Sequence, residues 1–448
     1  MFKKYKSEYI VNLKLALPVM LSQLGQVVVQ LADNIMVGQY GDKDPLPLAA
    51  TSFGGAVFFL IYIACMALTF GITPIVGELF VQRRIKEAAK YLGNSIVLFP
   101  LIGFVAMIIQ FLAIPLMNYM GQPEEVVAMA IPYYKSLVWS VVPIMFFFVF
   151  KQFLEGLGNT KITMYIVIFC NAVNILLNYV LINGHWGAPE LGALGAGVAT
   201  LVSRVLQAII IFTFFLSVKK FRAYFENFKF RELERSYSVN LIKIGLPICS
   251  QVFFESSAFV ISGILMGYFG ANIIAANQIG VSMMNCAFMI VLAIGSATTI
   301  RISHCYGKRD FEQMKIASTA AFHLALVWNS LTAITFISLQ NILPQLFTSN
   351  EEMIHTASVL LVFIALFQIP DGLQCIGVGI LRGMQDVRAI FPISVFAYWM
   401  LNIPVGCLCA FVLGMGAKGL YIGFIVGLTT AAILLFRRIR KRHRELMF

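Results

Sequence analysis

The sequence contains few charged residues. Only 12% of its 448 residues are Asp, Glu, Lys or Arg, whereas 59% are hydrophobic and the mean hydropathy is +0.84. This share of charge is about half of that in ordinary soluble domains. So few charges cannot cover a water-exposed surface of this size, which disfavours a soluble enzyme, a disordered chain and a nucleic-acid binder. We therefore expect an integral membrane protein.

Catalytic and metal-binding motifs are also absent. None of the eight cysteines forms a C-x-x-C pair, and the five histidines lack metal-ligand spacing. The patterns H-E-x-x-H, G-x-x-x-x-G-K-[ST] and G-x-S-x-G do not occur. We therefore predict no enzyme activity and no cofactor. Because the chain has no P-loop for ATP, we expect a gradient of Na⁺ or H⁺ to supply the energy.

Twelve apolar runs are long enough to cross a membrane as helices of about 20 residues. They cover residues 12–39, 47–79, 92–117, 127–151, 162–183, 193–218, 239–268, 275–300, 316–343, 353–381, 389–413 and 417–437. Of the 33 Lys and Arg, 29 fall on one side of this topology, Lys43 and Lys418 on the other, and Lys135 and Arg204 within spans. The positive-inside rule then places both termini in the cytoplasm. This topology accounts for the net charge of +12, so we expect no nucleic-acid partner.

The two halves of the chain resemble each other. Leu17-Pro18 matches Leu246-Pro247 at an offset of 229, Leu48-Ala49-Ala50 matches Ile274-Ala275-Ala276 at 226, Pro143 matches Pro370 at 227, and Gly192-Ala193 matches Gly416-Ala417 at 224. Each half holds six spans, so both enter the membrane in the same orientation. We predict an all-α fold of twelve transmembrane helices in two pseudo-symmetric six-helix lobes around a central cavity. The expected bounds are 1–218 for the first lobe, 219–238 for a cytoplasmic linker and 239–448 for the second lobe.

Three acids lie inside predicted spans. Of the 21 Asp and Glu, eighteen fall in loops or at span ends, which leaves Asp33, Glu255 and Asp371. Carboxylates within a membrane are costly and mark functional sites by default. The repeat aligns them with neutral residues, namely Ser262, Gln26 and Ile144. A structural role shared by both lobes would preserve the charge twice, so this difference favours function.

In the first half, Gln26, Gln30 and Asp33 lie on one helix face, because they are separated by four and three residues. Asn174 and Asn178 form a second polar ladder, and Thr200 adds a hydroxyl. Such oxygen ligands suit Na⁺ or a proton relay. The alternative is a set of hydrogen bonds that only hold the helices together.

In the second half, Gln251 lies one turn from Glu255, and Pro370 bends the helix beside Asp371. Two acids in one low-dielectric cavity can exchange protons near neutral pH. The alternative is an ion pair with a buried base such as Arg204 or Lys135.

A further set of residues could line a substrate cavity, either as polar contacts or as an adaptable apolar surface for flat aromatic ligands. Plain packing is the alternative for each apolar member. The set comprises Gln26, Gln30, Gln251, Asn277, Met283, Met284 and Phe367.

Taken with these acids, Glu155-Gly156-Leu157-Gly158-Asn159-Thr160-Lys161 after the fourth span resembles the MATE (multidrug and toxic compound extrusion) family, in its bacterial NorM-like branch. The resemblance covers nearly the whole chain. It implies antiport of organic cations against Na⁺ or H⁺. By position, Asp33, Asn174, Asn178 and Thr200 resemble the family's first-lobe cation site, and Glu255 with Asp371 resembles its second-lobe acidic site. Many NorM-like members carry Tyr where Phe367 stands, so one possible oxygen ligand is missing.

We therefore predict a multidrug efflux antiporter that works by alternating access. Its expected partners are cationic amphipathic drugs and the lipid bilayer, and we expect a monomer. The alternative function is a flippase of lipid-linked oligosaccharides, which should place bases in the cavity to meet pyrophosphate. Only Arg204 and Lys135 are available within spans.

Overall fold

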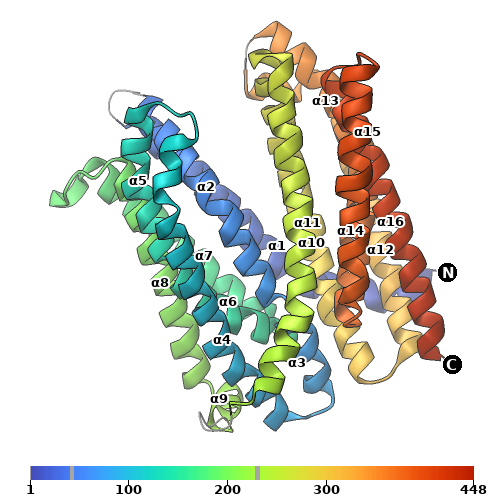
Figure 1. Cartoon of the computed structure of the whole chain (residues 1–448). Helices are drawn as coiled ribbons and strands as arrows, with labels where there is room; N and C mark the ends of the chain where they lie inside the picture. Colours follow the sequence, from blue (N-terminus) through green and yellow to red (C-terminus); the bar gives the residue numbers. More distant parts are fainter. Residues whose placement is uncertain (1, 41–44, 228–232, 349, 448) are drawn as a thin grey trace. The chain divides into compact units, whose positions relative to one another are not determined.

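The computed structural model describes residues 2–40, 45–227, 233–348 and 350–447, so residues 228–232 of the expected linker lie outside it. All regular elements within these ranges are helical (Figure 1). Twelve helical segments among them are long and apolar enough to cross a membrane, which confirms the predicted number of spans.

Several spans consist of two consecutive helices with a break between them. The first half contains α1 (Phe2–Gly38), α2 (Pro45–Thr69), α3 (Ile72–Val81), α4 (Ile85–Leu112), α5 (Glu124–Trp139), α6 (Val141–Gly156), α7 (Thr160–Asn183), α8 (Ala193–Ser217) and the short α9 (Lys219–Glu226). The second half contains α10 (Arg235–Met266), α11 (Ala271–Gly307), α12 (Phe311–Ser338), α13 (Glu351–Gly383), α14 (Ile390–Ser394), α15 (Ile403–Cys407) and α16 (Ala417–Met447). Two π-helical stretches, Val395–Asn402 and Leu408–Val412, flank α15.

The chain forms two compact units. The N-unit is Leu21–Cys249, and the C-unit combines Met1–Met20 with Ser250–Phe448. Both divisions fall inside long helices, α1 and α10, and neither coincides with the expected bounds at residues 218 and 239. Each unit therefore contains the start of a helix whose remainder belongs to the other unit.

Polar contacts explain why the start of α1 belongs to the C-unit. Glu8 is 2% exposed, and its carboxylate accepts hydrogen bonds from Arg301 at 2.8 and 2.6 Å and from Gln313 at 2.6 Å. Tyr9 lies one residue further and hydrogen-bonds His323 at 2.8 Å. A buried carboxylate is tolerated only with such partners, so these residues fix α1 against α11 and α12.

Equivalent contacts attach the start of α10 to the N-unit. Ser238 donates to Asn94 at 3.0 Å, and Asn240 donates to Tyr91 at 2.7 Å. Close packing follows further along α10, because a Cβ at Gly245 would lie 2.5 Å from the carbonyl oxygen of Leu68. Only glycine allows this approach where α2 ends.

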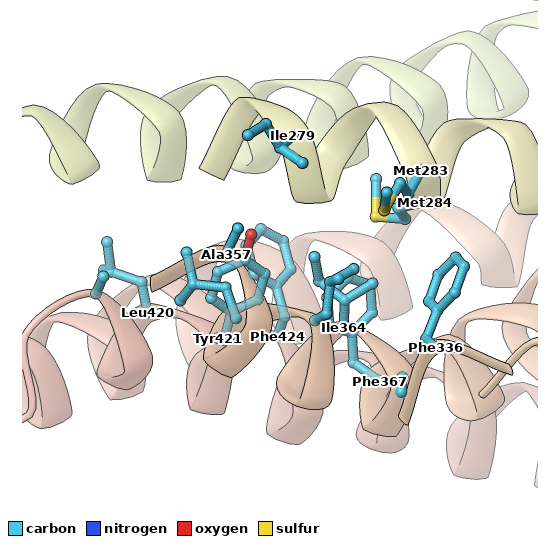
Figure 2. Close-up of a cluster of buried hydrophobic side chains, with 14 of the residues drawn as sticks. Ile279, Met283, Met284, Phe336, Ala357, Ile364, Phe367, Leu420, Tyr421 and Phe424 are labelled. Atoms are coloured by element: carbon cyan, nitrogen blue, oxygen red, sulfur yellow. The ribbon is translucent and has the colours of Figure 1, made fainter. Parts of the chain in front are cut away.

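The core of the C-unit is apolar and contains residues that the sequence placed at a cavity. Figure 2 shows Ile279, Met283 and Met284 on α11 facing side chains of α13 and α16. Phe367 is fully buried there and stacks on Tyr421 with 5.9 Å between ring centroids. The cluster holds the helices of this unit together through burial of apolar surface.

Candidate functional site

The first in-span acid lies within the N-unit, where α1 approaches α7. The side-chain amide of Asn178 donates a hydrogen bond to Asp33 and a second one, of 3.2 Å, to Asn174. Asn178 is fully buried and Asn174 is 4% exposed. Three of the four residues predicted for the first-lobe site are therefore brought together, with a carboxylate oxygen of Asp33 and the amide oxygen of Asn174 both accepting from Asn178.

The remaining predicted residues of this half do not join that contact. The hydroxyl of Thr200 donates to the carbonyl of Ala196 on its own helix at 3.0 Å. Gln26 and Gln30 are exposed in the structure, with no hydrogen bond recorded among the described residues. Their predicted roles as a cation ligand and as substrate contacts stay predictions.

Arg204 on α8 is held without an acid. Its guanidinium donates to Ser140 at 2.7 Å and lies 5.2 and 4.9 Å from the ring centroids of Phe58 and Tyr62. Within the described residues it forms no ion pair, although it is near enough to Asp33 for an electrostatic interaction. At the offset of 224 its repeat-related residue is Leu428, which is fully buried. The fold therefore accepts an apolar side chain at this position.

In the C-unit, Glu255 on α10 is the centre of a hydrogen-bond network. Gln251 donates to it from one turn earlier, the hydroxyl of Tyr398 donates to Oε1 at 3.1 Å, and Gln374 is a further hydrogen-bond partner. Arg382 at the end of α13 donates to Gln251 at 2.6 Å and interacts electrostatically with Glu255. The base that interacts with Glu255 is thus Arg382 of the same unit, and no ion pair of Glu255 with Arg204 or Lys135, the alternative that the sequence left open, is recorded among the described residues.

Asp371 is the second acid of this unit and lies close enough to Glu255 for the two charges to interact. It is 4% exposed, and its Oδ1 is buried without a hydrogen-bond partner among the described residues. The amide oxygens of Gln368 and Gln374, which share α13 with it, are also buried and unpartnered. Buried acceptors in this state need a donor or a cation to offset their lost hydration.

The predicted substrate contacts of this half have two kinds of environment. Met283, Met284 and Phe367 belong to the packed apolar core shown in Figure 2, with exposed fractions of 9%, 7% and 0%. Asn277 instead accepts a 2.6 Å hydrogen bond from Tyr421, and Gln251 lies in the network of Glu255. Packing accounts for the three apolar side chains, so their role toward a substrate stays a prediction.

The sequence did not single out four residues of these networks, namely Gln374, Arg382, Ser140 and Tyr398. Arg382 follows Asp371 by eleven residues, which is three helical turns, so its place on the same face of α13 could have been found from periodicity. Ser140 lies at the break between α5 and α6, and Tyr398 lies in a π-helical stretch. Both positions interrupt the regular helical spacing on which a sequence pattern depends.

The chemistry of these networks suits binding of monovalent cations or protons. The described residues contain no group of three or more His, Cys, Asp or Glu that could hold a metal ion. The oxygen atoms come mainly from single carboxylates and neutral amides, which are hard donors of low total charge.

Comparison with known proteins agrees with this description. The sequence profile of the MatE family matches residues 18–180 and 247–408, and the two matches begin 229 residues apart, the offset of the predicted repeat. The chain is 30% identical over 450 residues to the multidrug resistance protein NorM of Vibrio vulnificus (strain YJ016), covering 99% of this chain and 97% of that protein.

Solved structures share the fold. An outward-facing multidrug resistance MATE family transporter of the MOP superfamily is similar with a TM-score of 0.88 and 22% identity, covering 98% of this chain and 97% of that one. The eukaryotic MATE transporter AtDTX14 is similar with a TM-score of 0.87 and 18% identity, covering 99% of both chains.

Fold and buried carboxylates together define a multi-pass, all-helical membrane protein with an internal repeat and titratable groups inside its spans. The chain belongs to the MatE family. This confirms the resemblance that the sequence indicated.

Proposed function

We propose that this protein is a secondary active multidrug efflux antiporter of the bacterial inner membrane, with both termini in the cytoplasm. It exports cationic amphipathic compounds in exchange for Na⁺ or H⁺. The family and the similarity to a multidrug resistance protein support transport of drugs. The coupling to an ion gradient is inferred from the carboxylates inside the spans.

One observation carries the proposal: each unit encloses its own carboxylate site. Asp33 is held by Asn178 in the N-unit, whereas Glu255 is held by Gln251 and Tyr398 in the C-unit. Nothing in the repeat requires these charges, because the aligned residues are neutral. Since an uncompensated carboxylate within a membrane is costly, retaining three of them indicates that they bind a mobile cation.

The mechanism follows from linkage. A drug binds to the inward-facing state, and a cation from outside then occupies the carboxylates of the outward-facing state. The cation can drive export only if it binds the two conformations with different affinity. When it neutralises a carboxylate, it removes the charge that attracts a cationic drug, and release of the drug becomes favourable.

The three acids provide the test. Asp33→Asn, Glu255→Gln and Asp371→Asn keep the shape of each side chain but remove its charge, and each is expected to reduce drug resistance and gradient-driven efflux at normal expression. Glu125→Gln is the matched control, because Glu125 is an exposed acid in the first turn of α5. If all three variants transport as well as this control, the proposed mechanism is wrong.

A further inference from the structure

A basic hollow lies in the N-unit where α3 ends and α4 begins. Its volume is about 520 Å³, and it is lined by Arg83, Arg84, Ile85, Lys86, Glu87 and Asn227. The first five residues form the α3–α4 turn and the start of α4, whereas Asn227 follows α9. Two segments separated by 140 residues of sequence (227 − 87) therefore enclose one site with three bases and one acid.

For two of the three bases in this hollow, the part of the chain that the structure describes records no partner. Arg84 donates to Glu87 at 3.0 and 2.5 Å and to Gln82 at 3.1 Å, so that the acid is already neutralised. Arg83 and Lys86 are exposed, and no hydrogen bond or ion pair is recorded for their side chains among the described residues. Among the described residues, the hollow therefore carries two positive charges without a paired acid.

The repeat shows which of these bases the equivalent turn of the C-unit shares. At the offset of 226, Arg83 corresponds to Arg309, and both adopt a positive φ, of 56° and 57°. Arg84 corresponds to Asp310, which accepts a capping hydrogen bond from the backbone N–H of Gln313 at 3.0 Å, and Lys86 corresponds to Glu312.

Acids are the residues that favour the start of a helix, because its dipole is positive there and bases oppose it. The C-unit follows this preference, whereas α4 carries Arg84 and Lys86 at the same positions without a side-chain cap. The first turn of α4 also carries an acid, Glu87, which pairs with Arg84, so Lys86 is the base whose presence helix stability does not explain.

The position of the hollow indicates what it meets. One candidate span ends at Val81 and the next begins at Ile85, so Arg83 and Arg84 lie within one helical turn of both. Ile85 is 44% exposed and lines the hollow beside the bases. A site with cations next to an apolar surface, at the depth where spans end, matches the boundary between phosphate headgroups and acyl chains.

The neighbouring α9 has the same character. Phe221 and Tyr224 are buried, whereas Lys219 and Lys220 are exposed at its start. Both rings pack against Phe215 and Phe153 of the N-unit, so α9 shares with the turn its exposed bases, which add positive charge near the hollow.

We propose that this hollow binds the phosphate group of an anionic phospholipid. Arg83 and Lys86 contact the phosphate oxygens as charge-assisted donors, and Ile85 contacts the start of an acyl chain. In the repeat-related turn of the C-unit, Arg309 matches Arg83, but acids stand at the positions of Arg84 and Lys86, so the full set of bases occurs in only one of the two turns compared.

The purified full-length protein in a nonionic detergent provides the test. Native mass spectrometry measures the apparent affinity for phosphatidylglycerol and for phosphatidylcholine with identical acyl chains. The wild type is expected to prefer phosphatidylglycerol. A base near an anionic headgroup contributes about fivefold in affinity, so Arg83→Gln with Lys86→Gln should weaken phosphatidylglycerol binding roughly 30-fold and leave phosphatidylcholine unchanged.

The control is Arg440→Gln with Arg444→Gln, which removes two exposed charges from the end of α16. It is expected to bind phosphatidylglycerol as the wild type does. Each single variant, Arg83→Gln or Lys86→Gln, should lose about fivefold and replaces the double variant if that one does not fold.

Three results would overturn the proposal. The variants of Arg83 and Lys86 could keep the preference for phosphatidylglycerol, in which case these bases would only set the topology of the chain. Both double variants could lose affinity equally, which indicates unspecific attraction. Inorganic phosphate at the concentration of the lipid could displace it, which would indicate a site for a free anion.

Discussion

At the scale of single residues, the buried acids differ in how they are compensated. Glu255 receives hydrogen bonds from several side chains of its own unit, whereas Asp371 keeps an oxygen without a partner. Donors stabilise the charged form of a carboxylate and compete with any cation that binds to it. We therefore expect a bound cation to leave Glu255 more easily than Asp371, whose Oδ1 has no hydrogen-bond donor among the described residues.

Tyr398→Phe tests this competition. Removing the hydroxyl takes away the 3.1 Å hydrogen bond to Glu255, so its cation should bind more tightly. A hydrogen bond to a charged group contributes about 1.5 kcal/mol or more, so the cation concentration for half-maximal efflux should fall about tenfold. Tyr421→Phe, which removes the bond to Asn277, should leave that concentration unchanged. Equal shifts in both variants would contradict the role of Tyr398.

Substitution of Arg204 tests whether this charge within a span contributes to the stability of the fold. Its ring contacts and its hydrogen bond to Ser140 are offset by the cost of burying a guanidinium, and its repeat-related residue is an apolar one. Arg204→Leu should therefore change the free energy of unfolding by less than about 1 kcal/mol. Arg301→Leu should cost about 3–5 kcal/mol, because it leaves the buried carboxylate of Glu8 unpaired. Thermal melting in detergent compares them, and equal losses would contradict this account.

The acids could be predicted from the sequence, but helical periodicity could not predict all of their partners. Asp33, Glu255 and Asp371 stand out because charges are rare within apolar runs. The pairing of Asp33 with Asn178 follows from two regular ladders. Tyr398 lies in a π-helical stretch, where the i→i+5 hydrogen bonds shift the face that each side chain occupies.

At the scale of helices, the breaks and close approaches depend on particular residues. The Cβ that a substitution would add at Gly245 lies 2.5 Å from the carbonyl oxygen of Leu68, which is backbone and cannot move aside cheaply. Gly263 lies on the same helix and has nothing within 4 Å of such a Cβ. Packing therefore requires glycine at position 245 of α10 but not at position 263.

Substitution of these glycines should have opposite effects. Gly245→Ala should destabilise the protein by about 1–3 kcal/mol through overpacking. Gly263→Ala should stabilise it by about 0.5–1 kcal/mol, because alanine has the higher helix propensity. Thermal melting in detergent measures both. Destabilisation by Gly263→Ala, or tolerance of Gly245→Ala, would contradict the packing described for α10.

At the scale of the whole molecule, the two units exchange the beginnings of α1 and α10. The repeat predicted two halves of six spans, and the double match to the family profile agrees with it. The exchange could not be predicted from the sequence, because both helices continue without interruption across the division. Single polar contacts, such as those of Glu8, determine to which unit each helix beginning belongs, and helical periodicity does not reveal such contacts.

This exchange has a consequence for fragments of the chain. If the chain is cut within the linker, residues 1–218 lack most of the C-unit, whereas residues 239–448 lack the segment Met1–Met20 that completes it. Each fragment expressed alone should be unstable, and the two expressed together should assemble. Affinity purification through a tag on one fragment measures this assembly. A stable fragment 239–448 that keeps its fold without residues 1–20 would contradict the exchange.

Gradient-driven efflux from proteoliposomes tests the central claim most directly. Vesicles that hold the purified protein and a fluorescent organic cation receive either a Na⁺ gradient or a pH gradient of equal size, in separate experiments. We predict that at least one of the two gradients accelerates movement of the organic cation, and that Glu255→Gln abolishes this acceleration. Movement at the same rate with and without either gradient would contradict antiport and indicate a passive channel.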